Sequence, residues 1–307
     1  MTTAQRTESP PRRPQGMTKA AKVERWAGLV LASPALLVFT VFMFVPLVLT
    51  FWYSLNSYSG FGDLEFVGLE NYTTIVSDST FWRAAINTVV FTAVTVPMGI
   101  ALGLGAALLV NRWMPGRGLF RGLFYVPVVI SGVASGVIFL RLFDPLVGIL
   151  NQLANSLGLP SVDWQGDERA AMVSIIVVST WQSIGFGMVV YLAALQGIPR
   201  EVYEAGTVDG AVGWKRLRHI TWPLVAPTTF FLVVYAIIQS FQVFDSVYVL
   251  TRGGPGNATT FLVQYAYEEG FNQRRQGYAA AIGVIIYVVV LIFTVLQWRL
   301  SRTRDEV

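Results

Sequence analysis

The sequence contains no cysteine and only one histidine, His219, among its 307 residues. The lack of cysteine excludes disulfides, cysteine-ligated metal sites and thiol nucleophiles. A single histidine excludes most histidine-based metal sites and argues against a Ser–His–Asp triad. Charged residues are also scarce, at 13% of the chain, whereas soluble domains have roughly 25%. Hydrophobic residues make up 54%, which indicates an integral membrane protein.

Six apolar runs are each long enough to cross a hydrocarbon core of roughly 30 Å. They cover about residues 27–55, 85–110, 123–143, 171–195, 224–250 and 279–300. The short alternating segments of a membrane β-barrel do not occur. The sequence therefore predicts an all-α integral membrane protein with six transmembrane helices.

The distribution of positive charge predicts the orientation of these spans. If the N-terminus is cytoplasmic, sixteen of the 22 Lys and Arg residues lie in cytoplasmic segments and six lie outside. Positive residues concentrate on the cytoplasmic side of membrane proteins, so we expect both termini there. Residues 1–25, rich in Pro, Arg and Thr, are predicted to be a disordered cytoplasmic tail. Residues 303–307 form the cytoplasmic C-terminus in this prediction.

The first predicted outer loop, between the first and second runs, is long for a connector and mixes aromatic with acidic residues. Two interpretations are open: a surface for an external partner, or a structured cap. The triplets at Asn71 and Asn257 match glycosylation sequons, but such triplets are common by chance and we assign them no function.

The inner loop between the fourth and fifth runs is the most charged part of the chain. Pro199 is suited to open a first helix, and Gly210 is suited to break it. The stretch "WKRLRHI" then resumes a helical pattern, so we expect two helices on the cytoplasmic face, with Pro223 at the start of the next span. A membrane-surface amphipathic helix fits less well, because Glu201 and Glu204 would face anionic headgroups.

The spacing in this loop resembles the "EAA" loop of binding-protein-dependent ABC importer permeases. The residues that carry the match are Glu204, Ala205 and Gly206, then Gly210 after three residues, and Ile220, Trp222 and Pro223 at the end. Gly206 stands where the family pattern has alanine, and Trp222 where it has leucine. The stretches "QGIPREVYEAGTVDGA" and "FDSVYVLTRGGPGNATT" further resemble the carbohydrate-type branch, which includes MalF-like and UgpA-like permeases. The similarity covers residues 26–302.

This resemblance implies a type I ABC importer permease fold over residues 26–302, in a bacterial inner membrane. The loop at residues 200–223 would be the coupling helix that docks on a cytoplasmic ATPase. The residues implied in coupling are Glu204, Ala205, Gly206, Asp209, Gly210, Ile220 and Pro223. The implied partners are a second, homologous permease, an ABC ATPase dimer, an extracytoplasmic solute-binding protein and membrane lipid, with no nucleic acid.

The chain itself is not expected to be an enzyme or to bind a cofactor or metal. A phosphate-binding loop needs a Gly-Lys pair, and this dipeptide does not occur in the sequence. ATP and Mg²⁺ would be used by the partner ATPase. The fragment Gly103-x-Gly105 lies inside an apolar run, so we interpret it as small-residue helix packing and not as a nucleotide site.

Polar side chains within the fourth and fifth runs are candidates for a substrate pathway. Packing between helices is the alternative role, in particular for Gln242 and Asp245. Amides beside the aromatic ring of Phe186 suit a sugar, and a breakable helix around Gly185 and Gly187 suits a moving gate. The resemblance implies substrate contacts at Gln182, Ser183, Phe186, Ala236, Gln239, Ser240 and Val243.

We therefore expect an importer permease subunit that translocates a di- or oligosaccharide. A glycerol-3-phosphate or glycerophosphodiester importer is the nearest alternative. It is disfavoured because no Lys or Arg lies mid-span to hold a phosphate. An ion-coupled secondary transporter is more distant, since it would show related halves within one chain, and no internal repeat is present.

Overall fold

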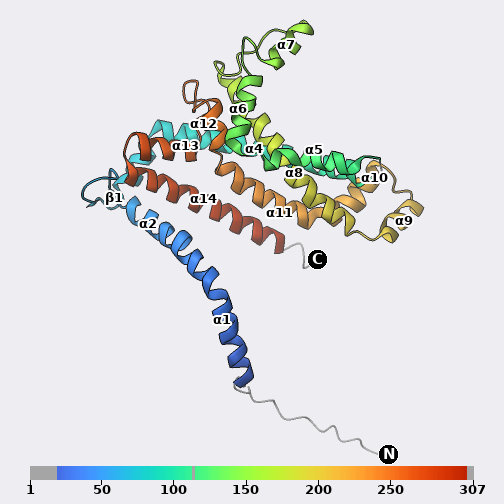
Figure 1. Ribbon diagram of the computed structural model, residues 1–307, viewed down its shortest axis with the longest axis horizontal. Coiled ribbons are helices and arrows are strands. Elements are labelled where there is room, and N and C mark those ends of the chain that lie inside the picture. Colours follow the sequence, from blue (N-terminus) through green and yellow to red (C-terminus); the bar gives the residue numbers. More distant parts are fainter. Residues whose placement is uncertain (1–18, 113–114, 303–307) are drawn as a thin grey trace, which may run out of the picture. The chain divides into compact units, whose positions relative to one another are not determined.

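The computed structural model describes residues 19–112 and 115–302, which are mainly helical (Figure 1). The chain divides into two units, residues 1–52 and 53–307. Residues 1–18 and 303–307, to which most of the N-terminal tail and the C-terminal segment were assigned, lie outside the described residues. Helix α1 begins at Lys19, so the assignment of residues 19–25 to a disordered tail was wrong.

The N-terminal unit is one long apolar helix. It consists of α1 (Lys19–Phe39), the π-helical turn η1 (Thr40–Phe44) and α2 (Val45–Ser54), which extends past the boundary of the unit. The segment Trp26–Ser54 has 29 residues, and an 18-residue window within it has a mean hydropathy of 2.4, so it is long and apolar enough to cross a bilayer. The first predicted span is thus confirmed as a helix of the required length and composition.

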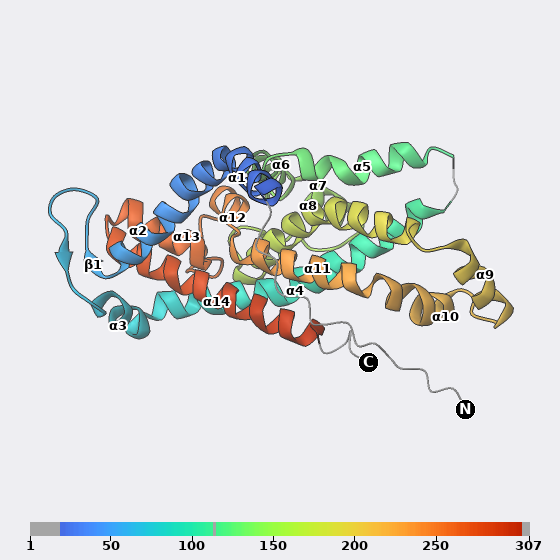
Figure 2. The ribbon, with the colours of Figure 1, turned by 90° about the horizontal axis from the view of Figure 1, so that it is seen from below.

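The second unit is built around four long apolar helices that run alongside one another (Figures 1 and 2). They are α4 (Ser79–Asn111), α8 (Glu168–Gln196), α11 (Trp222–Phe241) and α14 (Gln276–Arg302). Among the described residues, five helices are long and apolar enough to span a membrane, or six if a bent pair counts as one span. The all-α membrane fold predicted from hydropathy is confirmed.

Helices α4 and α8 approach closely because glycines face each other at their crossing. A methyl group added to Gly103 would lie 3.2 Å from the Cα of Gly187. Such a close approach is typical of membrane helices, where packing takes the place of the hydrophobic effect. This confirms the interpretation of the Gly103 segment as a packing site. Met188 and Tyr191 of α8 are fully buried beside this contact.

The third predicted span is not one straight helix. It consists of α5 (Arg117–Val129) and α6 (Gly132–Leu142), which meet at an angle of 101°. The cause is local: Ile130 has extended backbone angles, and the Ser131 hydroxyl accepts a bond of 3.2 Å from the Ala134 amide as the N-cap of α6. The prediction of a continuous span was wrong here because hydropathy does not detect a serine cap.

The fifth predicted span differs at both ends. The short helix α10 (Trp214–Arg216) continues through the π-helical turn η2 (Leu217–Thr221) into α11, so the predicted separate surface helix was wrong. At the other end, α11 stops at Phe241, and α12 (Asp245–Leu250) starts after a short break. Helix α8, by contrast, runs unbroken through Gly185 and Gly187 in this structure, and their role as a gate stays a prediction.

The end of the second unit opposite α9 (Arg200–Val208) carries the short elements (Figure 1). They are the strands β1 (Asn56–Ser57) and β2 (Glu65–Phe66), the helices α3 (Glu70–Ser77) and α13 (Leu262–Tyr267), and the π-helical turn η3 (Glu268–Asn272). The strands pair antiparallel. Asn71 Nδ2 donates to the carbonyl oxygens of Ser54 and Asn56, at 2.9 and 3.0 Å. These contacts favour the structured-cap interpretation of the first outer loop.

The carboxylate of Asp78 joins the helices α4, α13 and α14. Asp78 is the N-cap of α4, accepting from the Thr80 amide at 2.8 Å, and its Oδ2 also accepts from the hydroxyls of Tyr265 in α13 and Tyr278 in α14. Partial burial would raise the pKa of Asp78, but the tyrosine and backbone hydrogen bonds outweigh it and hold that pKa below its usual range. Burial, together with the bond to Asp78, raises the pKa of Tyr265.

The connection between α6 and α8 contains α7 (Ile149–Ser156) and stands away from the long helices (Figure 1). Asn151 is buried at its centre and binds the chain on both sides: its Nδ2 donates to Pro145 and Val162 carbonyls, and its Oδ1 accepts from the Trp164 indole at 3.2 Å. Backbone amides of Leu146 and Val147 bond to Asp144, which lowers the pKa of that carboxyl.

Candidate functional site

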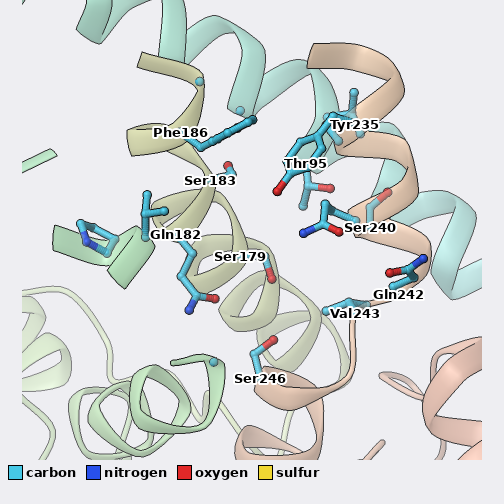
Figure 3. Close-up of a pocket in the computed structure, with 18 of the residues that line it drawn as sticks. Thr95, Ser179, Gln182, Ser183, Phe186, Tyr235, Ser240, Gln242, Val243 and Ser246 are labelled. Atoms are coloured by element: carbon cyan, nitrogen blue, oxygen red, sulfur yellow. The ribbon is translucent and has the colours of Figure 1, made fainter. Parts of the chain in front are cut away.

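A cavity of about 450 Å³ lies between α4, α8, α11 and the two breaks at α5–α6 and α11–α12 (Figure 3). All eight residues predicted for the substrate pathway line it: Gln182, Ser183, Phe186, Ala236, Gln239, Ser240, Val243 and Asp245. The volume lies within the range of about 300–1,000 Å³ that small-molecule sites occupy. Two helices far apart in sequence, α8 and α11, thus contribute side chains to one space.

Two of the polar residues also bind neighbouring helices. Gln182 Nε2 donates to Ser135 Oγ of α6 at 3.0 Å. Ser240 Oγ donates to Thr92 Oγ1 of α4 at 2.9 Å. These bonds hold the cavity walls together, so both residues serve helix packing as well as lining the space. Ser183 bonds within its own helix, to the Thr180 carbonyl.

The amides of Gln239 and Gln242 are different, because neither makes a side-chain hydrogen bond within the described part of the chain. Both are exposed at the cavity. An amide presents two N–H donors and one carbonyl acceptor, which is the set that a hydroxyl-rich ligand requires. Figure 3 shows Gln242 and Ser240 on the α11 side and Ser183 and Phe186 on the α8 side. The cavity thus has free amides on one wall and an aromatic ring on the other.

Asp245 lies at the point where the two helix breaks meet. A methyl group added to Gly132, the first residue of α6, would come within 2.7 Å of Asp245 Oδ2. The carboxylate therefore lies against the N-terminal turn of α6, where the helix dipole favours a negative charge. Asp245 also lines the cavity, so its position suits both roles considered for it, the substrate pathway and packing between helices.

Several lining residues were not predicted as site residues, among them Thr95, Ser179 and Tyr235. Thr95 and Ser179 are small polar residues within apolar runs, a weak signal because such side chains usually bond within their own helix. Thr95 does so, donating to the Phe91 carbonyl at 2.8 Å. Tyr235 lies four residues before Gln239, so helical spacing from a predicted contact was a signal for it.

Glycines shape the turn of the EAA-like loop, which precedes α11. Helix α9 ends at Val208, and Gly210 follows with φ +76°, a conformation that residues with a side chain rarely adopt. The Ala211 amide donates to the Gly206 carbonyl at 2.7 Å, which closes the turn. Gly206 is buried, and a methyl group there would meet Ile220 Cδ1. The glycine in place of alanine thus admits a close contact between α9 and η2.

The other predicted coupling residues lie at the surface of this loop. Glu204, Ala205, Asp209 and Pro223 are exposed, and Ile220 is half-buried. Arg216 Nη2 donates to Thr207 Oγ1 at 3.0 Å and connects α10 to α9. Val208 and Trp214 are 89% and 72% exposed, so an apolar surface accompanies the carboxylates. The loop therefore presents both charged and apolar side chains outward from a rigid turn.

Residues 99–305 match the family model described as "Binding-protein-dependent transport system inner membrane component". The chain belongs to this family. The match covers α8, the EAA-like loop, α11 and the part of α4 from Gly99 onward, so the eight predicted pathway residues and the predicted coupling residues fall within it, whereas Thr95 of the cavity wall lies before it. The permease is accordingly a multi-pass membrane protein and a transmembrane subunit of an ABC transporter.

Curated relatives cover nearly the whole permease. It is 35% identical over 278 residues to "Probable ABC transporter permease protein YurN" of Bacillus subtilis, covering 88% of this chain and 94% of that protein. It is 34% identical over 280 residues to "Trehalose/maltose transport system permease protein MalF" of Thermococcus litoralis, covering 91% and 95%. "Lactose transport system permease protein LacF" of Rhizobium radiobacter is 36% identical, with coverage of 90% and 94%.

A solved structure agrees in fold. "Crystal structure of bacterial alginate ABC transporter in complex with alginate pentasaccharide-bound periplasmic protein" contains a chain that matches with a TM-score of 0.82. The similarity covers 92% of this chain and 96% of that one, at 24% sequence identity. At this identity the likeness concerns the fold, and it agrees with the type I importer permease fold implied by the EAA-like loop.

Proposed function

We propose that this permease translocates a neutral di- or oligosaccharide as one half of the membrane pore of an ATP-driven importer. A second, homologous permease would form the other half. An ATPase dimer on the cytoplasmic side and an external solute-binding protein would complete the transporter. The observation that carries the proposal is the cavity, which is lined both by the amides of Gln239 and Gln242, without side-chain hydrogen bonds in the described residues, and by the ring of Phe186.

Sugar chemistry fits this lining. A pyranose has hydroxyl groups around its rim and C–H groups on its faces, so amides suit the rim and an aromatic ring suits a face. Two of the relatives named above carry trehalose and maltose, or lactose, in their names, and another, from Bacillus subtilis, carries arabinooligosaccharides. These names support a carbohydrate as the substrate class.

The charge of the cavity favours a neutral substrate over an anionic one. Its lining, within the described residues, includes the carboxylate of Asp245 and no Lys or Arg. A glycerol phosphate, or an acidic polysaccharide such as the alginate named for the structural neighbour, would lack a cationic partner there. The glycerol-phosphate alternative therefore has no observation in its favour.

Transport by the reconstituted complex tests the proposal. The permease, its second permease, the ATPase and the binding protein would be placed in proteoliposomes, and ATP-dependent uptake of radiolabelled maltose, lactose, an arabino-oligosaccharide and glycerol-3-phosphate would be compared. We expect uptake of at least one of the sugars and none of glycerol-3-phosphate. Uptake of glycerol-3-phosphate alone would overturn the assignment.

A further inference from the structure

A series of aromatic rings begins in the cavity wall at Phe186 and Tyr235 and extends beyond the cavity lining to Phe231, toward the EAA-like loop. The rings of Phe186 in α8 and Tyr235 in α11 lie 4.6 Å apart between centroids, at an interplanar angle of 35°. Phe231, one helical turn further toward the N-terminus of α11, lies 6.4 Å from Tyr235 at 21°. Figure 3 shows Tyr235 and Phe186 together at one end of the cavity. The three rings form one series across two helices.

The two α11 rings lie on the exposed face of that helix. Phe231 is 52% exposed and Tyr235 is 38% exposed, whereas Leu232 on the other face is 2% exposed. Phe231, Tyr235 and Gln239 follow one another at intervals of four residues, the spacing of a single helix face. The face of α11 that carries the Gln239 amide therefore also carries the rings of Tyr235 and Phe231, one and two helical turns further toward the N-terminus of the helix.

These rings could bind a ligand through their apolar faces and the Tyr235 hydroxyl. The Tyr235 hydroxyl makes no hydrogen bond within the described residues, and half-exposed ring surface in a membrane protein needs a partner. Tyr235 lines the cavity, so its ring is open to a ligand there. A sugar would bury its C–H faces on the rings and bond its hydroxyls to the Tyr235 oxygen.

We propose that Tyr235 and Phe231 bind further units of an oligosaccharide whose first unit lies between Phe186 and the amides. The inference rests on the proposed function, since it extends the same cavity along α11. It implies that the permease holds more than one sugar unit at a time, and that units beyond the first lie toward the EAA-like loop. Longer substrates would depend on these rings more than short ones.

Uptake as a function of chain length tests this inference. The complete transporter in proteoliposomes would carry Phe231→Ala or Tyr235→Ala, and maltodextrins or arabino-oligosaccharides would be the probes, whichever series the unaltered transporter takes up. We expect uptake of a tetrasaccharide to fall about tenfold, which corresponds to about 1.4 kcal/mol, while uptake of the disaccharide of the same series changes little. Tyr235→Phe keeps the ring and should retain most of the tetrasaccharide uptake.

Phe42→Ala is the matched control, because Phe42 is 75% exposed on the N-terminal apolar helix and does not line the cavity. Equal losses for both sugar lengths would overturn the inference, as would dissociation of the purified complex, which would make the rings an interface with the second permease. If the unaltered transporter takes up lactose but neither series, the inference fails while the sugar assignment stands, and if it takes up no sugar at all, both fail. Failure of the sugar assignment is seen in the unaltered transporter, so it is distinguishable from failure of the inference about Tyr235 and Phe231.

Discussion

Single residues in the EAA-like loop perform different tasks, although they are close in sequence. Gly210 supplies a positive φ of 76°, and Gly206 supplies room for Ile220. Glu204 does neither, because it is exposed and its side chain makes no hydrogen bond or ion pair within the described residues. The glycines therefore shape the turn, and the carboxylate remains available to a partner. This division leads to separate expectations for the two kinds of residue.

Substitution of Glu204 or Gly210 should uncouple the permease from its ATPase. Removal of one side of a desolvated interfacial charge pair costs about 2–5 kcal/mol, so Glu204→Ala should weaken docking. Gly210→Leu should distort the turn because a side chain is strained at this φ. We expect both variants to insert normally and to lose binding-protein-stimulated ATP hydrolysis and uptake in proteoliposomes. Glu65→Ala, an exposed carboxylate at the other end, is the control, and normal transport by both loop variants would refute the role.

The cluster around Asp78 should make stability depend on acid. The pKa of Asp78 is lower in the folded state than the value of about 3.9 expected when unfolded, so the unfolded state binds its proton first as the pH falls. Its contribution is therefore full above about pH 4 and is lost as the pH falls through the lowered pKa. Thermal unfolding in detergent between pH 7 and pH 3 measures this loss.

Asp78→Asn should lower the melting temperature at pH 7 and flatten this part of the pH profile. The reason is that an uncharged amide accepts weaker hydrogen bonds from Tyr265 and Tyr278 than a carboxylate does. Asp63→Asn alters an exposed acid in the same outer region and should leave the profile unchanged. An unchanged profile in Asp78→Asn would contradict the assignment.

At the scale of elements, two nearby glycines of α4 differ in the space around them where this helix crosses α8. Gly103 faces Gly187 across the crossing, while Gly105, two residues further on, has no atom near the position of an added methyl group. Gly103→Val should force the helices apart at a cost of about 1–3 kcal/mol. Gly105→Val should be tolerated. Melting temperatures of the two purified variants compare them, and equal values would show that the crossing does not depend on close contact.

The helix breaks illustrate which element boundaries the sequence can predict. The helix α9 was predicted well because Pro199 and Gly210 are strong start and stop signals. The breaks at Ser131 and at Gln242–Phe244 lie within apolar runs, where hydropathy continues without change. Glycines within a helix suit either a break or close packing, and in α8, which is unbroken in this structure, Gly185 and Gly187 allow close packing. Glycine alone does not distinguish these two uses.

At the scale of the whole molecule, the charge distribution makes a topological prediction. We expect the EAA-like loop to be cytoplasmic and α7 to be outside. Because the chain has no cysteine, single substitutions provide unique labels. Ser156→Cys should react with a membrane-impermeant maleimide in intact cells, whereas Val208→Cys should react only after permeabilisation. Both residues are exposed, so access to the side chain is not limiting. The reverse pattern would invert the topology.

The cavity itself could be predicted only in part. Eight residues were predicted from polar side chains in apolar runs and from the family spacing. All eight line the cavity. Thr95 and Ser179 were missed because nothing in α4 or α8 alone distinguishes a side chain that faces the cavity from one that faces lipid, and for Tyr235 the only signal was its spacing of four residues from Gln239. Only the placement of α4, α8 and α11 around one space identifies them.

The sequence by itself determined the membrane class, the approximate spans, the coupling-loop spacing and the family, because hydropathy, glycine and proline signals, and motif spacing are local properties of a chain. The tertiary structure alone decided where spans break, which glycines pack and how the cavity is assembled. Its deciding contacts, such as Gln182 with Ser135 and Ser240 with Thr92, join residues far apart in sequence. The energy of such contacts depends on how the helices pack, which no local pattern specifies.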